Sequence, residues 1–448
     1  TAATALFVGT NTKGILAATT SETELSNPFV RIDQDGQVTV LVKHFEMGQG
    51  TTTGLTTLLA EELDADWALI KTEFAPADVK KYGNLNWGGA FQGTGGSSAI
   101  ANSFLQYRKA GAAARSLLVQ AAAKKWGVSE SQIKVEKSQI ISGNKRAHFG
   151  EFVAIASGLT PPTEPKLKTP DQFNLIGKEF ISRKDNSGKV TGQATFAMDV
   201  RIPGMVYASV ARSPKFGGLL KSFNADEAKK VTGFIQALAL PNNEGVVVFA
   251  EDTWSAFKAR DAIKAEWDFT NAETRSSDEM FKEYKEAVLA PALHATQTTS
   301  ADLQEKLKNA DQVIDLEFNF PFLAHAPMEP LNCVIEPTET GIRFHDGCQI
   351  PTLVQGGIAK LLGLTPEQIE INTVYAGGSF GRRANATNDY QTEAAMAFDL
   401  LGRKVPVKLV WSREDDIRGG YYRPMAVHKA IVGLDKEGKI SAWDHRIA

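Results

Sequence analysis

Apolar and polar residues alternate near the start of the chain, over residues 29–42. A period of two is typical of a half-buried strand, and the Asp35-Gly36 pair in the middle predicts a hairpin. The period then changes to that of a helix, whose apolar face carries Leu55, Leu58, Leu59 and Leu63. The pattern therefore predicts a strand pair followed by a helix.

A similar change of period recurs twice along the chain. An Ala-rich helix is predicted over residues 99–126, where Gly127 stops it, and a second helix over residues 355–363 precedes a strand over residues 369–374. Both helices are followed by capping-box spacing, at residues 129–132 and 365–368. Because the spacing is irregular, we expect a mixed α/β architecture of the α+β class and not a tandem repeat.

The middle of the chain begins after a Pro-, Thr- and Lys-rich stretch at residues 160–175, which predicts a linker. Residues 270–300 are polar and acid-rich, so we expect an exposed crossing segment there. A third unit starts near residue 310 and still alternates like a strand at residues 430–447, so the sequence is expected to stop inside a domain. For the second unit we expect strands at 195–200, 205–211, 233–240 and 245–250 and helices at 225–230 and 254–265.

Composition narrows the function classes. The 448 residues carry a net charge of −3, which gives no basic footprint for nucleic acid. Two cysteines are too few for an iron–sulfur cluster or a disulfide framework, and the seven histidines lack H-x-x-x-H spacing for a metal. No stretch is long and apolar enough to span a membrane. Residues 1–18 are similar to the back half of an export signal, with a flexible arm as the alternative.

Three glycine-rich stretches are candidates for ligand binding. Residues 376–383 (A-G-G-S-F-G-R-R) follow a strand, and glycine lets main-chain N–H groups reach a ligand beside two arginines suited to anions. Residues 93–98 (G-T-G-G-S-S) precede the long helix, whose positive end favours an anion. Residues 47–50 (M-G-Q-G) place an amide between glycines, which suits a ring with donors and acceptors. Taken singly, each stretch could equally be an ordinary turn.

Weaker candidates lie in the third unit. His325 and Glu329, between prolines, are possible acid and base groups, although a structural role is the alternative. Cys348 could be a nucleophile or a buried structural thiol. Tyr421 and Tyr422 indicate a surface or subunit-contact loop.

Together the motifs resemble the molybdenum hydroxylases, the xanthine dehydrogenase and aldehyde oxidase family, and within it the large (beta) subunits of the isoquinoline 1-oxidoreductase type. The likeness covers most of the chain from residue 26 onward. It is carried by E-M-G-Q-G (46–50), Q-G-T-G-G-S-S-A-I-A-N-S (92–103), A-H-A-P-M-E-P-L-N-C (324–333), G-C-Q-I-P-T (347–352), A-G-G-S-F-G-R-R (376–383) and R-G-G-Y-Y-R-P (418–424).

The resemblance implies a domain order. Residues 26–165 would be the family's second molybdopterin-binding segment, permuted to the front. Residues 176–275 would be the α/β hammerhead domain. Residues 305–448 would be the first part of the catalytic cofactor-binding domain, incomplete here. Residues 1–25 remain a residual export signal or flexible arm.

The resemblance also implies a cofactor and the residues that hold it. Molybdenum would be held by molybdopterin, as its cytosine dinucleotide, with no protein ligand to the metal. Gln349 would lie near the metal's oxo group and Phe380 against the substrate, and both are the predicted catalytic residues. The cofactor-binding residues would be Gly48, Gln49, Gly50, Thr94, Gly95, Gly96, Ser97, Ser98, Gly378, Ser379, Phe380, Gly381 and Arg382.

The reaction implied is hydroxylation of an aldehyde or an N-heteroaromatic compound, with water as the oxygen source. Electrons would pass to a small [2Fe–2S] subunit, with a cytochrome c as a further candidate partner, after twin-arginine export to the periplasm. The family's base, a Glu in a Gly-x-Gly-Glu motif, is missing, so we expect it from a C-terminal remainder of the large subunit. Ala386 replaces the Arg of purine-oxidising members, so purines are not expected. The alternative is a non-catalytic cofactor-binding or assembly protein.

Overall fold

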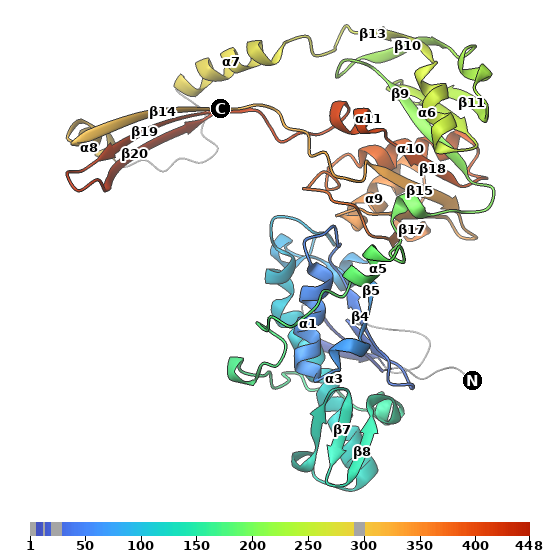
Figure 1. Ribbon diagram of the computed structural model, residues 1–448, viewed down its shortest axis with the longest axis vertical. Coiled ribbons are helices and arrows are strands. Elements are labelled where there is room, and N and C mark those ends of the chain that lie inside the picture. The colour runs from blue at the N-terminus through green and yellow to red at the C-terminus, as the bar shows by residue number, and fades with distance from the viewer. Residues whose placement is uncertain (1–5, 12–13, 19–28, 291–300) are drawn as a thin grey trace.

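The computed structural model describes residues 6–11, 14–18, 29–290 and 301–448 (Figure 1). The first region is built on a five-stranded sheet in the order β2-β1-β3-β4-β5. The hairpin predicted over residues 29–42 is confirmed, because β3 and β4 pair antiparallel. Of the segment expected to be a signal or arm, β1 and β2 form a hairpin, and the remainder lies outside the described residues. The strands are β1 (Leu6–Asn11), β2 (Gly14–Ala18), β3 (Val30–Ile32), β4 (Val38–Val42) and β5 (Lys71–Phe74).

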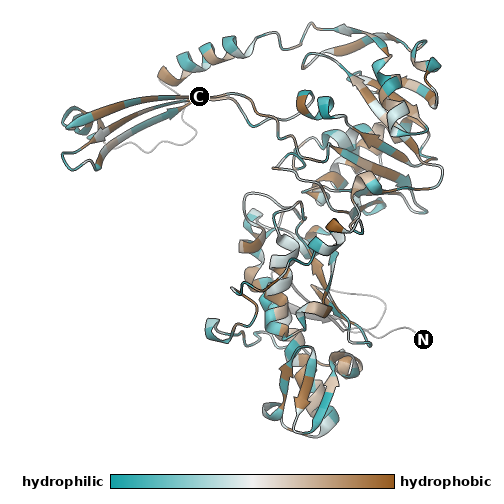
Figure 2. Cartoon of the chain, viewed as in Figure 1, coloured by the Kyte–Doolittle hydropathy of each residue, from teal (hydrophilic) through white to brown (hydrophobic). Residues whose placement is uncertain are grey.

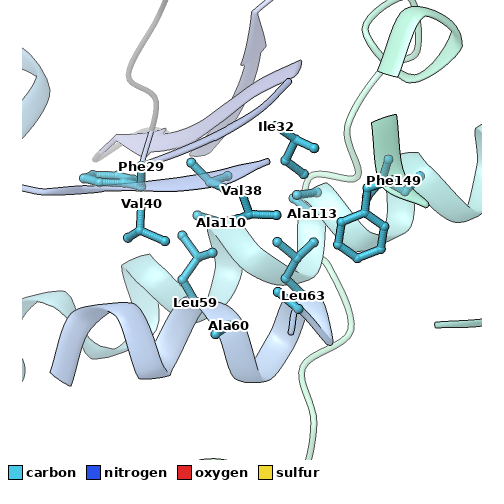
Figure 3. Close-up of a cluster of buried hydrophobic side chains, with 14 of the residues drawn as sticks. Phe29, Ile32, Val38, Val40, Leu59, Ala60, Leu63, Ala110, Ala113 and Phe149 are labelled. Atoms are coloured by element: carbon cyan, nitrogen blue, oxygen red, sulfur yellow. The ribbon is translucent and has the colours of Figure 1, made fainter. Parts of the chain in front are cut away.

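Two predicted helices are confirmed, α1 (Thr51–Leu63) and α3 (Ala99–Trp126). They pack together and against this sheet. Figure 3 shows side chains from β3, β4 and both helices meeting in one core. The helices approach closely because α3 presents small residues. A Cβ on Gly111 would lie 2.3 Å from the Leu59 carbonyl oxygen. α3 ends where Gly127 adopts a left-handed conformation with φ +66°.

The first region continues into a small three-stranded sheet and then into the predicted linker. The sheet contains β6 (Lys134–Glu136), β7 (Gln139–Ser142) and β8 (Lys145–His148), followed by α4 (Val153–Ala156). The linker is tied down at its end: the buried Glu61 carboxylate accepts the N–H groups of Asn174, Leu175 and Ile176. Two short helices flank these parts, α2 (Val79–Tyr82) and α5 (Asn186–Val190).

A seven-stranded sheet, in the order β11-β12-β9-β18-β15-β16-β17, forms the second region. β9 pairs in parallel with β18, so strands from the second and third predicted units share one sheet. The boundaries of those units remain predictions. The strands are β9 (Val206–Arg212), β11 (Phe234–Ala239), β12 (Gly245–Ala250), β15 (Asn332–Pro337), β16 (Ile342–Asp346), β17 (Ile369–Thr373) and β18 (Val407–Val410). The helices around it are α6 (Thr253–Asp261), α9 (Pro351–Leu362), α10 (Asp389–Leu400) and α11 (Arg413–Arg418).

Two expectations for the middle of the chain are wrong, and one helix there was not expected. Residues 195–200 contain a 3₁₀ turn, Ala197–Asp199, because the Asp199 carboxylate accepts the Phe196 N–H and closes the backbone. The helix expected at residues 225–230 is reduced to another 3₁₀ turn, Ala228–Lys230. The crossing segment contains α7 (Ser277–Leu289), which begins with a Ser276–Glu279 capping box; residues 291–300 lie outside the described residues.

The third region is an arm that extends away from the seven-stranded sheet (Figure 1). Its three-stranded sheet is ordered β14-β19-β20, and the alternation expected at residues 430–447 is confirmed. Apolar side chains on it are exposed, including Phe318, Trp443 and Ile447, and Figure 2 shows apolar positions along these strands. The elements of the arm are β14 (Gln312–Phe320), β19 (Ala426–Leu434), β20 (Ile440–Ile447) and α8 (Leu303–Lys308). β10 (Leu219–Asn224) and β13 (Lys264–Asp268) pair with each other in a separate two-stranded sheet. Within the described ranges, no helix has the length and hydropathy needed to cross a membrane.

Candidate functional site

Three glycine-rich loops, far apart in sequence, are joined by one hydrogen-bond network. We name them loop A (residues 46–50, between β4 and α1), loop B (residues 93–98, before α3) and loop C (residues 377–383, after β17). Loop B is joined to Phe45, the residue directly before loop A, because the Phe45 N–H donates to Thr94 Oγ1 at 2.8 Å.

Gln349 connects loop B to loop C. The Thr94 N–H donates to the Gln349 carbonyl at 2.8 Å, and Gln349 Nε2 donates to the Thr94 carbonyl at 2.7 Å. The Ser379 hydroxyl of loop C donates to Gln349 Oε1. Gln349 is only 2% exposed, so its amide links the loops from within. The structure thus brings together the predicted residues of all three motifs, although their individual roles stay predictions.

Loop A is held by a buried carboxylate. Glu46 accepts the N–H groups of Gly48, Gly50 and Thr52 at 2.8, 3.0 and 2.9 Å. The N-terminus of α1 therefore already holds a negative charge. Gln49 is exposed, but its amide donates to the Phe45 carbonyl and accepts the Met47 N–H. The amide keeps one lone pair on its oxygen and one N–H whose nearest acceptor, Thr51 Oγ1, lies at 3.5 Å, so it can still bond a ring.

Loop B ends at the N-terminus of α3, which carries no such charge. The Ser98 hydroxyl donates to the Gly95 carbonyl and accepts from Asn84 Nδ2, both at 2.7 Å. No side chain caps α3, and its first turn contains no acidic residue. Gly96 and Ser97 are exposed and have φ of +59° and +55°. The Ser98 N–H donates to the Gly95 carbonyl at 3.2 Å, so the N–H groups of the exposed Gly96 and Ser97 are the ones that can hold an anion, together with the positive helix end.

Loop C exposes an aromatic ring on a left-handed backbone. Phe380 has φ +56° and a side chain 75% exposed, between Gly378 and Gly381, which also have positive φ. A non-glycine residue in this conformation is uncommon and often marks a functional loop. The ring is therefore available to a ligand or to another polypeptide.

The two arginines of loop C are buried and have internal partners. Arg382 pairs with Asp389 at 2.5 Å. Arg383 donates to the carbonyl oxygens of Gly378 and Glu329 at 3.2 and 3.1 Å. These charges hold the loop in place, although Nε of Arg382 is buried without a hydrogen-bond partner among the described residues. The cofactor role predicted for Arg382 stays a prediction.

The acid and base candidates occupy structural positions. The Glu329 carboxylate accepts the Gly377 N–H at 2.8 Å and Asn332 Nδ2 at 3.0 Å. Burial, followed by the nearby Arg382 charge, lowers the pKa of His325. Its Nδ1 is buried and lacks a hydrogen-bond partner within the described part of the chain, as does Oδ1 of Asp416.

The thiol candidate is inert. Cys348 and Cys333 are fully buried, and burial raises the pKa of each thiol well above its usual value. The alternative of a buried structural thiol is therefore confirmed for Cys348. Beneath it, burial raises the pKa of Asp346 to about 6, while the Tyr390 hydroxyl and Gln391 amide donate to that carboxylate at 2.8 Å.

Several residues of the site carried no recognised sequence signal. Arg183 donates to the Gly48 carbonyl at 2.9 Å from 135 positions away, and Asn84 supports Ser98. Glu46 could have been found as an acidic residue just ahead of a helix start. Across the described residues, no group of three or more His, Cys, Asp or Glu side chains is placed to hold a metal ion.

Comparison with known proteins gives two family matches. Residues 4–205 and 283–448 each match the family described as "Molybdopterin cofactor-binding domain". The chain is 32% identical to the beta subunit of isoquinoline 1-oxidoreductase of Brevundimonas diminuta, over 94% of this chain and 59% of that protein. It is 30% identical to a membrane-bound aldehyde dehydrogenase (pyrroloquinoline-quinone) of Gluconacetobacter polyoxogenes, over 93% and 54%. It is 26% identical to a nicotinate dehydrogenase subunit of Pseudomonas putida, over 96% and 36%.

The chain thus spans little more than half the length of the first two relatives. Among solved structures, it is similar to quinoline 2-oxidoreductase from Pseudomonas putida 86, with a TM-score of 0.47 and 18% identity over 58% of this chain and 38% of that chain. It is also similar to aldehyde oxidoreductase from Desulfovibrio gigas, with a TM-score of 0.46 and 17% identity over 65% and 37%.

Proposed function

Because the chain belongs to the molybdenum hydroxylase family, whose molybdopterin cofactor-binding domains it carries, we propose that loops A, B and C form its cofactor site. In this proposal the chain is the cofactor-binding part of a large subunit that oxidises an aldehyde or an N-heteroaromatic compound. The named relatives act on compounds of both kinds. Ala386 at the purine-recognition position argues against purines.

The observation that carries the proposal is the contrast between two neighbouring helix ends. The N-terminus of α1 is neutralised by Glu46, whereas the N-terminus of α3 has neither a side-chain cap nor an acidic residue. A Cβ on Gly96 would meet no atom within 4 Å, so the backbone beside that end is open. An anionic group, such as the phosphate of molybdopterin, fits this donor set.

The residues of this chain would then hold and orient the cofactor. N–H groups of residues 95–97 would bind its phosphate end, while the remaining lone pair and N–H of the Gln49 amide would bond the pterin ring. Gln349 would hold loops B and C at a fixed separation beside the metal, and the exposed Phe380 ring would pack against the substrate. The bound group would supply two-electron oxidation with water as the oxygen source.

The finer proposals rest on the resemblance. We infer the cytosine dinucleotide form of the cofactor. Its nucleotide would be bound by residues other than those that contact the pterin and the phosphate. Electrons would leave to a small [2Fe–2S] subunit, and a cytochrome c is a further candidate. We propose a periplasmic location, reached by the twin-arginine route.

Metal and pterin analysis of the purified complex tests the proposal. We expect about one molybdenum per large subunit, by the family's one-cofactor stoichiometry, with a fluorescent oxidised pterin and a released cytosine nucleotide. An aldehyde panel and an N-heterocycle panel, assayed with an artificial electron acceptor, identify the substrate class. A complete complex that contains neither metal nor pterin contradicts the proposal and leaves a non-catalytic role.

A further inference from the structure

Lys43 is a buried cation directly behind loop A, at the end of β4. Its side chain is 3% exposed. Its ammonium donates to Gln106 Oε1 at 2.7 Å, to Asn102 Oδ1 at 2.9 Å and to the Gly83 carbonyl at 3.4 Å. All three acceptors are neutral. Among the residues that the structure describes, no carboxylate contacts this ammonium.

Two fully buried lysines of the described chain, Lys43 and Lys408, donate only to neutral acceptors. Lys168, which is also largely buried, pairs with the carboxylates of Glu61 and Asp64. Burying an ammonium without a counter-charge is costly, because its hydration is lost and no opposite charge replaces it. Burial accordingly lowers the pKa of Lys43 to about 7.

The ammonium lies behind the open end of α3. Asn102, which accepts from Lys43, donates its own amide to the Ser98 carbonyl at 2.6 Å, and Ser98 is the N-cap of α3. Gln106 is one helical turn further along the same helix. Asn102 therefore links the Lys43 ammonium to the N-cap residue of the helix end at loop B.

We propose that Lys43 is the buried counter-charge for the anionic group that binds at the N-terminus of α3. The inference rests on the proposed function, since the anion in question is the phosphate end of the cofactor. Lys43 is a positioning residue: it does not touch the anion but stabilises its negative charge across one layer of amide side chains. The ligand would then supply the negative charge that the amide acceptors of Lys43 lack, whereas Lys408, with carbonyl acceptors, has no such role.

The groups around Lys43 do not titrate with it near neutral pH. His44, on the same strand, contacts Asn102 Nδ2 and Ser103, and burial together with the Lys43 charge lowers the pKa of His44 to about 3. On α2 and α3, burial raises the pKa of Tyr82 and of Tyr107 above its usual value. His44 and both tyrosines are therefore neutral between pH 6 and 9.

The proposal predicts a pH-dependent grip on the cofactor. Below its pKa Lys43 is protonated, and a bound anion raises that pKa further. As the pH rises from about 7 towards 9, Lys43 loses its proton and the cofactor should dissociate faster. Removing the charge permanently should speed release at pH 6 and abolish the pH dependence.

The test measures cofactor release from the purified holo complex. Wild type, Lys43→Met, Gln106→Glu and Lys408→Met are dialysed at pH 6, 7, 8 and 9 at fixed salt, and the pterin remaining per chain is measured by fluorescence after oxidation. Gln106→Glu keeps an acceptor for Lys43 but gives it a buried carboxylate, so it cancels the charge without emptying the network. Lys408 is the matched control, a buried lysine whose ammonium donates to the Met198 and Val200 carbonyls.

We expect Lys43→Met and Gln106→Glu to release pterin faster than wild type at pH 6 by roughly tenfold, the order expected for one lost charge interaction. Their release should be flat from pH 6 to 9, while Lys408→Met follows the rising wild-type profile. Equal release by Lys43→Met and wild type at pH 6 would overturn the inference, as would loss from Lys408→Met alone. A wild-type complex without any pterin would overturn the proposed function as well.

Discussion

Replacing Gly96 with valine tests the anion site at loop B. Gly96 is exposed with φ +59°, and a Cβ there would meet no protein atom within 4 Å. The protein itself therefore has room for the new side chain. A bound phosphate would lack room, because the branched side chain would lie over the N–H groups at the start of α3.

The size of the effect follows from two separate costs. A left-handed conformation costs a residue other than glycine about 1–2 kcal/mol, which lowers the stability of the chain slightly. Each charge-assisted hydrogen bond lost to the phosphate costs about 1.5–3 kcal/mol of binding, or roughly 10- to 100-fold in affinity. Gly96→Val should therefore unfold at nearly the wild-type temperature and yet be isolated almost free of cofactor.

Gly143 provides the matched control, since it is exposed with φ +57° and a Cβ there also meets nothing within 4 Å. It lies in the turn between β7 and β8, away from the three loops. Molybdenum and pterin per chain are measured for wild type and both variants, together with their melting temperatures. The reasoning is refuted if Gly96→Val retains a full complement of cofactor, or if Gly143→Val loses as much.

Three further predictions follow from individual contacts. Gln349→Ala should lower turnover with the cofactor still bound. It should also reduce the free energy of unfolding by about 1–3 kcal/mol, because the Thr94 carbonyl and the Ser379 hydroxyl lose a partner. Loss of pterin together with activity would show that Gln349 anchors the cofactor. Glu46→Gln should destabilise the chain by about 1–3 kcal/mol in denaturant melts, since the α1 end loses its counter-charge, and unchanged stability would argue against that cap. Burial opposes ionisation of Asp185, but Arg183 and Lys189 outweigh it and lower its pKa to about 2. Asp185→Asn should therefore cost about 1–2 kcal/mol at pH 7, and its deficit relative to wild type should shrink as pH falls from about 5 towards 2, because the unfolded-state carboxyl protonates first; a pH-independent deficit would contradict this.

The sequence predicted best those elements whose signal is local. The helix over residues 99–126 was bounded correctly because alanine-rich spacing continues up to Gly127. The 3₁₀ turn at residues 197–199 was missed because the sequence there resembles a strand. In the folded chain the Asp199 carboxylate accepts the Phe196 N–H, and this hydrogen bond overrides the apolar pattern. α7 was not predicted because its surface is polar, although the Ser276–Glu279 capping box marks its start.

The site shows the same division. Glycine spacing located all three loops, but it could not say which groups inside them remain open to a ligand. The pairing of Arg382 with Asp389, seven positions further along the chain, carries no sequence signal of its own. An isolated lysine such as Lys43 forms no pattern in the sequence. Its burial against Asn102 and Gln106 exists only in the folded chain.

A structure of the cofactor-loaded complex would test the central claim most directly, because it locates the anion. The account predicts phosphate oxygens within hydrogen-bond distance, about 2.7–3.2 Å, of main-chain N–H groups at residues 95–97. It also predicts the metal beside Gln349 and Phe380. A cofactor bound with its phosphate away from the N-terminus of α3 would contradict it.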